Sequence, residues 1–246
     1  MRRGVDFAKI YATDLVYIPG CWQLCGNGNC CSFSRQKARF RLLGGQPAQE
    51  LPLLPGEYEY LQRRDLLKKF GDHHHRVVNY AFGPRTMRIE TIVSRRPGCA
   101  CDHATRTTVC RLYPFLPVLD LDGGLKGIER LGLFEVIEAL EGQERICQVE
   151  SMPDGEAEKF MTITRVIASD PRALFYVGAY QIAQHHVRSR LIELRGNREA
   201  DYLSIFEMAL FRQRLVDHAA LAVRLTSLAE ALEARHGPLG LDFALA

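Results

Sequence analysis

The chain has 246 residues, of which 47% are hydrophobic and 25% charged, and its formal net charge is +3. This composition is typical of a globular protein that can bury a real core, as one large domain or two small ones. The small net charge does not favour a nucleic-acid partner, no apolar run is long enough to span a bilayer, and no secretory signal is visible. We therefore expect a cytoplasmic protein with no membrane partner.

The first half of the chain combines short strands with one helix. A helix is predicted over residues 56–70, because its first turn carries acids, its last turn carries lysines, and Gly71 follows it. Residues 77–82 and 87–93 are predicted to form a β-hairpin around Gly83-Pro84. Alternating or short apolar runs predict two further strands, at residues 16–18 and 38–43.

The second half is mostly helical from about residue 125. Asp170 followed by Pro171 predicts a helix start, and an apolar stripe then continues to Leu194 before Gly196-Asn197. The short link to the next leucine-rich helix predicts an antiparallel helical hairpin. The helices expected in this half cover residues 128–140, 157–168, 171–195 and 199–235.

The predicted fold class is therefore α+β. A small metal-binding α+β region, residues 1–124, is followed by a mainly α-helical region, residues 125–246, and the packing of both as one domain is left open. The helical region would offer a surface for a homo-oligomer or a protein partner.

The cysteines point to the function. Seven of the eight lie in two groups, and only Cys147 stands apart. In the cytoplasm thiols stay reduced, so clustered cysteines indicate metal binding or catalysis more often than the alternative, disulfides. The candidate metal ligands are Cys21, Cys25, Cys30, Cys31, Cys99, Cys101 and Cys110.

The spacing of these thiols suits a site that closes the fold. Nearby cysteines supply ligands from one turn, a distant group completes the set, and Gly26-Asn-Gly-Asn29 can turn tightly between them. Cys30 and Cys31 are adjacent, so their side chains diverge. Either one is a ligand and the other supports it, or the site holds more than one metal atom.

The Cys21-Trp-Gln-Leu-Cys25 spacing, the Cys30-Cys31 doublet and Cys110-Arg-Leu-Tyr-Pro resemble the YkgJ-type cysteine-cluster family of zinc- or iron-chelating proteins. The resemblance covers roughly residues 20–120, and the Leu54-Pro-Gly-Glu57 segment also fits it. It implies that the cysteines of both groups are metal ligands, with Cys99 or Cys101 as one of them. The family usually has two residues before its doublet, whereas Gly26 to Asn29 are four.

The metal is either an iron–sulfur cluster or zinc. Zinc sites favour Cys-x2-Cys turns, which this sequence lacks. Seven thiols exceed one tetrahedral zinc site but suit an iron–sulfur cluster with spare thiols, or two ions, and the pattern favours the cluster slightly. Basic residues near the thiols would offset their negative charge, or they form an ordinary solvated face; they are Arg35, Lys37, Arg39 and Arg111.

Other candidates have plainer interpretations. His103 lies between two of the cysteines and could add a nitrogen ligand, whereas His73-His74-His75 is interpreted as a polar loop, because consecutive side chains point in different directions. Glu57 and Glu59 are interpreted as first-turn helix acids, and Cys147 as a buried apolar residue. On the long helices, core or surface roles are expected for His185, His186 and His218.

Two hypotheses of function follow. The first is a metal-binding protein whose cluster stabilises the fold or handles metal or electrons. The second is a metal- or iron–sulfur-dependent modifying enzyme of methyltransferase-like kind, since flagellin lysine N-methylases carry a related cysteine-rich region. A third, a zinc-stapled nucleic-acid binder, is disfavoured because the helices mix both signs of charge.

Overall fold

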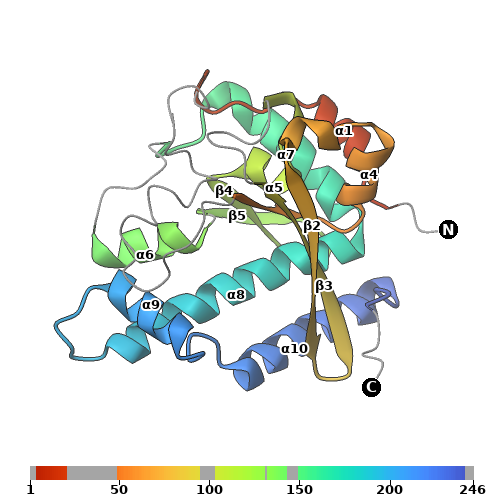
Figure 1. The fold of residues 1–246 in the computed structure, drawn as a ribbon. Coiled ribbons are helices and arrows are strands. Elements are labelled where there is room, and N and C mark those ends of the chain that lie inside the picture. The colour runs from red at the N-terminus through yellow and green to blue at the C-terminus, as the bar shows by residue number, and fades with distance from the viewer. Residues whose placement is uncertain (1–3, 21–48, 95–102, 131, 143–148, 242–246) are drawn as a thin grey trace.

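The computed structural model describes residues 4–20, 49–94, 103–130, 132–142 and 149–241. In these residues the chain is α+β, as predicted, with helices packed around two antiparallel sheets (Figure 1). The larger sheet has the order β1 (Gln49–Leu53), β3 (Arg85–Ser94), β2 (His73–Phe82), and β4 (Phe115–Leu119) pairs with β5 (Leu125–Arg130). None of the helices described is long and apolar enough to cross a membrane.

The predicted hairpin is confirmed, and its strands are longer than expected. Phe82 pairs with Arg85 across Gly83-Pro84, and the pairing continues to His73 opposite Ser94. The tip of the hairpin lies against α10 (His218–His236) in Figure 1. There the Arg85 guanidinium contacts the Glu233 carboxylate at 2.6 Å, so the strands of the first half are anchored to the last helix.

The region before the hairpin differs from the prediction in three places. The helix expected over residues 56–70 divides into α4 (Glu57–Arg63) and the 3-10 helix η2 (Leu67–Phe70), because Asp65 between them has a φ of 55°. The strand expected at residues 16–18 does not form, and a helix, α1 (Phe7–Ala12), precedes that segment. Strand β1 was missed because it contains Pro52, which an edge strand tolerates. The strand expected at residues 38–43 lies outside the described residues.

The helix predicted over residues 128–140 starts too early. Residues up to Arg130 belong to β5, and α6 (Leu133–Glu141) begins only after Gly132, whose φ of 124° is not helical. The helix expected over residues 157–168 is α7 (Asp154–Ala168). The next prediction is confirmed at both ends by α8 (Pro171–Arg195), where the Asp170 side chain accepts from the Arg172 and Ala173 amides.

The helix predicted over residues 199–235 is two helices, α9 (Tyr202–Phe211) and α10. The chain turns between them at Gln213, which has a φ of 54°, and Asp217 caps the start of α10. Helices α8 and α10 lie side by side in opposite directions, since Gly178 approaches Leu228 and His186 bonds to Asp217. The predicted simple two-helix pair is therefore replaced by three helices.

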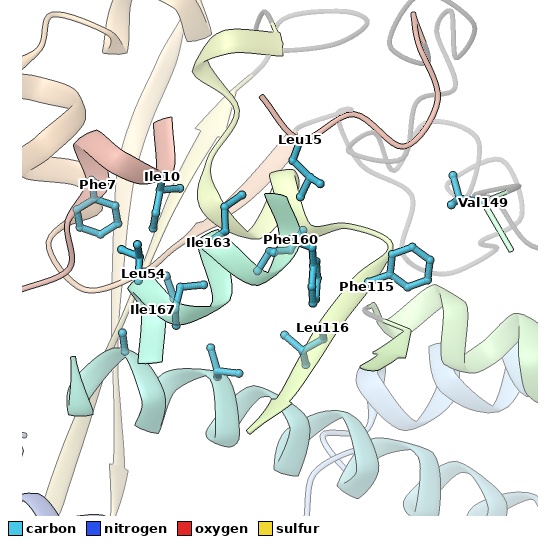
Figure 2. Close-up of a cluster of buried hydrophobic side chains, with 14 residues drawn as sticks. Phe7, Ile10, Leu15, Leu54, Phe115, Leu116, Val149, Phe160, Ile163 and Ile167 are labelled. Atoms are coloured by element: carbon cyan, nitrogen blue, oxygen red, sulfur yellow. The ribbon is translucent and has the colours of Figure 1, made fainter. Parts of the chain in front are cut away.

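The main core joins both halves of the chain. Figure 2 shows Phe7 and Ile10 of α1, Phe160, Ile163 and Ile167 of α7, and Leu116 of β4 gathered in one cluster. A second cluster places Phe82 and Met87 of the hairpin against Phe175 and Leu225 of the long helices. Apolar burial therefore runs across the predicted boundary at residues 124 and 125, while the division into two regions stays a prediction.

Candidate metal centre

The predicted ligand set falls mostly outside the described residues. Cys110 is the predicted ligand that the described part of the chain contains, and it is a free, half-buried thiol on α5 (Thr108–Leu112). His103 opens the 3-10 helix η3 (His103–Thr105) just before it. The cysteines outside the described residues are Cys21, Cys25, Cys30, Cys31, Cys99, Cys101 and also Cys147.

The carboxyl group of Glu57 holds the start of helix α5 in place. Glu57 is fully buried, and its Oε1 accepts hydrogen bonds from the Thr108 amide at 2.6 Å and the Thr108 hydroxyl at 2.7 Å. The Tyr11 hydroxyl donates to the same oxygen at 2.8 Å, and the Leu54 amide donates to Oε2 at 2.9 Å. A single buried acid therefore connects α1, the end of β1 and the start of the helix that carries Cys110.

Burial changes the protonation chemistry of this group. Loss of solvent raises the pKa of Glu57, although the hydrogen bonds that it accepts act in the opposite direction. Burial and the neighbouring Glu57 charge raise the pKa of Tyr11 well above its ordinary value, so that hydroxyl remains a donor. The interpretation of Glu57 as an ordinary first-turn acid is incomplete, because its side chain points into the core.

Arg111 is a buried cation next to Cys110. Its guanidinium donates to the carbonyl oxygens of Arg106 at 3.0 Å, Thr13 at 3.2 Å and Ala104 at 2.5 Å, and it lies over the Tyr11 ring at 4.6 Å. Only 2% of Arg111 is exposed, so the solvated-face interpretation is wrong for this residue. Its positive charge lies on the same short helix as the thiol.

The sheet pairs the two described residues that flank the cysteine-bearing segments. Gln49, the first described residue after segment 21–48, is the β-sheet partner of Ser94, the last described residue before segment 95–102. Directly opposed residues of antiparallel strands have Cα atoms only about 5 Å apart. Tyr17, in the described stretch before the first segment, also contacts α5, since its hydroxyl donates to the Leu112 carbonyl at 3.2 Å.

The histidine run forms part of β2 and is not a loop, so that interpretation is wrong. His73 and His75 share one face of the strand, and His75 bonds to Glu90 at 2.8 Å while it stacks on Tyr58 at 3.6 Å. Glu90 is 7% exposed and also contacts Arg88 at 3.2 Å, and no sequence pattern marked it. Within the described ranges no three His, Cys, Asp or Glu side chains are grouped to hold a metal ion.

The histidines of the long helices have structural contacts, as expected. His185 lies 3.0 Å from the Glu129 carboxylate, and Nε2 of His186 accepts from the Asp217 amide at 3.0 Å. His218 bonds to the Tyr80 hydroxyl at 3.1 Å. These contacts connect α8 and α10 to neighbouring elements.

An apolar cavity of about 290 Å³ lies beside α5. Thr108, Val109 and Leu112 line it from that helix, and β1, β3, β4, α7 and α8 contribute to its other walls. Tyr180 of α8 also lines the cavity. Burial is the main cause that raises the pKa of its hydroxyl, and the electrostatic effect of Cys110 adds to it. The cavity therefore lies against the helix that carries Cys110, and it would accept an apolar group.

No protein-family model, no curated protein and no solved structure matches this chain. The interpretation of the site therefore depends on its residues and on the geometry given above.

Proposed function

We propose that the protein is a cytoplasmic metal-binding protein similar to the YkgJ-type cysteine-cluster proteins. Its clustered thiolates would hold an iron–sulfur cluster or, alternatively, zinc or iron ions, which stabilise the fold or handle metal or electrons. The ligands would be drawn from Cys21, Cys25, Cys30, Cys31, Cys99, Cys101 and Cys110.

The pairing of Gln49 with Ser94 is the observation that carries this proposal. Two segments that hold six of the seven proposed ligands begin or end at neighbouring positions of one sheet. A metal site made by both segments then needs little additional chain ordering, because the sheet has already closed the loop between them. The arrangement favours one shared site over two separate ones.

The donor chemistry of Cys110 fits the same proposal. Its thiol is free and half-buried, and the positively charged Arg111 is the next residue of the same helix. The contacts of Glu57 hold α5 in place without using the thiol, so Cys110 can be a ligand at little cost in conformational entropy.

Metal analysis tests the proposal directly. Protein purified without air is expected to be brown and to contain iron and acid-labile sulfide, measured by its visible spectrum and by elemental analysis. Colourless protein with one or two zinc ions per chain would overturn the iron–sulfur assignment and keep the metal-binding function. Protein that binds neither metal after reconstitution would refute both.

The apolar cavity beside α5 favours a second candidate function. In a metal- or iron–sulfur-dependent modifying enzyme, such as a methyltransferase-like protein, a substrate group would occupy the chamber next to the thiol helix. The two functions differ in whether the metal keeps an open coordination position. Binding of cyanide or another small metal ligand, followed in the visible spectrum of the loaded protein, would favour the enzyme, and a spectrum insensitive to such ligands would contradict it.

A further inference from the structure

A second cavity, of about 430 Å³, lies between α4, β3 and α8, apart from α5 and its cysteine. Each of these elements contributes one arginine to its lining: Arg63, Arg88 and Arg172. Glu59 and Glu90 line it as well, so three positive charges face two negative ones. The volume is that of a site for a small metabolite.

The arginines retain capacity for a ligand. Arg88 and Arg172 are about half exposed and contact Glu90 at 3.2 Å and Asp170 at 3.6 Å. Arg63 is exposed, and no ion pair joins it to an acid in the part of the chain described. A guanidinium group presents several N–H donors in a planar fork, which suits the oxygens of a carboxylate or a phosphate.

Two polar atoms in the same lining lack partners. Glu59 Oε2 and Thr86 Oγ1 are buried, and no group in the described ranges forms a hydrogen bond with them. Buried polar atoms are normally paired, so such exceptions need an explanation. A ligand that donates a hydrogen bond would satisfy the Glu59 oxygen, and the Thr86 hydroxyl can either donate or accept.

We propose that this cavity binds a small organic anion whose carboxylate or phosphate group lies against the arginines and whose hydroxyl or amino group donates to Glu59. The first part follows from the three arginines that line the cavity from separate elements. The second follows from the unpartnered carboxyl oxygen. The proposal is independent of the cysteine cluster, since neither α5 nor Cys110 lines this cavity.

Thermal unfolding of the full chain at constant ionic strength tests the site with three probes: inorganic phosphate, L-lactate and propionate. A ligand that binds the folded state raises the melting temperature in a concentration-dependent way, which gives an apparent Kd. Lactate and propionate have the same carboxylate, but only lactate has a hydroxyl. We expect lactate or phosphate to bind, and lactate to bind more tightly than propionate.

Neighbouring arginines provide a matched control. Arg63 and Arg64 are both exposed at the end of α4, and only Arg63 lines the cavity. Arg63→Gln is expected to weaken binding about tenfold, the typical effect of losing a charge-assisted hydrogen bond, and Arg64→Gln is expected to leave it unchanged. Glu59→Gln should abolish the preference for lactate over propionate.

The results distinguish the alternatives. Binding of phosphate alone would indicate a phosphate ligand, and binding of lactate alone a hydroxy or amino acid; both support the proposal. Equal weakening by Arg63→Gln and Arg64→Gln would indicate general surface charge and overturn it. The absence of any stabilisation by lactate and phosphate beyond that of sodium chloride would also overturn it. Equal affinities for lactate and propionate in the unmodified protein would refute the role of Glu59.

Discussion

Glu57 determines where Cys110 lies. Its carboxyl oxygens accept from Tyr11, Leu54 and Thr108, which lie in three different segments. Because Thr108 is the first residue of α5, these bonds fix the start of a helix only five residues long. A helix of that length has little stability of its own in water, so tertiary contacts must hold it.

Glu57→Gln should therefore destabilise the protein. The amide has one acceptor oxygen, so its NH₂ group would face either the Leu54 amide or the donors of Thr108 and Tyr11. We expect the free energy of unfolding in urea to fall by about 1.5–3 kcal/mol, the range for a hydrogen bond to a charged group. The same substitution at exposed Glu158 on α7 serves as the control and should have almost no effect. Equal effects at the two positions would contradict the role of Glu57.

His186 makes the link between α8 and α10 sensitive to pH. Its Nε2 accepts from the Asp217 amide, and burial lowers the pKa of the ring below its ordinary value of 6.5. Asp217 acts against that shift, whereas Arg224, Arg190 and His218 add to it. Below the ordinary pKa the unfolded chain binds a proton that folded His186 does not, so stability falls as the pH falls.

The stability that His186 contributes should be complete above about pH 6.5 and lost progressively below it. Unfolding measured at about pH 7.5 and about pH 5.5 should show a larger loss in the unmodified protein than in His186→Gln, which keeps an acceptor but does not titrate. His74→Gln, at an exposed position of β2, is the control and should lose as much as the unmodified protein. A loss in His186→Gln that matches the control would contradict this linkage.

Side-chain direction is the part of the site that the sequence could not supply. The cysteine spacing selects Cys110 as a candidate, because thiols within a few residues are a local pattern. The inward direction of Glu57 depends on Tyr11 and Thr108, which are 46 and 51 residues away. Arg111 similarly reaches Thr13, 98 residues away, so its burial had no local signal.

At the scale of whole elements, α8 packs against α9 through one face and leaves an adjacent face exposed. Leu191 is fully buried in a cluster with Ile205 and Phe206 of α9, while its neighbour Ile192 is 47% exposed. Residues one apart on a helix point about 100° from each other, which explains the difference. Substitution of Leu191 therefore tests the packing of α8, whereas substitution of Ile192 tests the effect of the same change at the surface.

Leu191→Asp should destabilise the protein by more than about 3 kcal/mol, because it removes a buried apolar side chain and introduces an unpaired charge. Ile192→Asp should change stability by no more than about 0.5 kcal/mol, as expected for an exposed position. Both variants carry the same charge on the same helix, and thermal melting compares them. A melting temperature that Leu191→Asp leaves unchanged would count against packing of α9 on α8.

Element prediction succeeded where start and stop signals agreed with the apolar pattern. Asp170, Pro171 and Gly196 mark α8, and its bounds are confirmed. Element prediction failed where the apolar pattern of one helix continued, in the same spacing, past the residue at which that helix ends. The leucines before and after residue 213 share helical spacing, so the turn between α9 and α10 depends on the positive φ of Gln213 and on capping by Asp217.

At the scale of the whole molecule, elements from the first half of the chain share apolar clusters with helices of the second half. The hairpin packs on α8 and α10, and α1 packs on α7. Gln49 and Ser94, the described residues next to segments 21–48 and 95–102, are paired at one end of a sheet whose hairpin packs on the helical half. Metal bound by both segments would stabilise the entire fold, because the unfolded chain has no preformed site.

Substitution of single cysteines tests whether there is one shared site. Cys25→Ser and Cys110→Ser lie far apart in sequence, yet both should yield protein that is depleted of metal and sensitive to protease, since each removes a ligand of the same site. Cys147→Ser should retain its metal, because Cys147 belongs to neither group, although some stability would be lost if its side chain is buried. Cys31→Ser shows which role that residue has. Partial loss of metal would mean that Cys31 supports the site, and full loss would mean that it is a primary ligand. Full metal content in Cys110→Ser, together with complete loss in Cys25→Ser, would contradict the shared site.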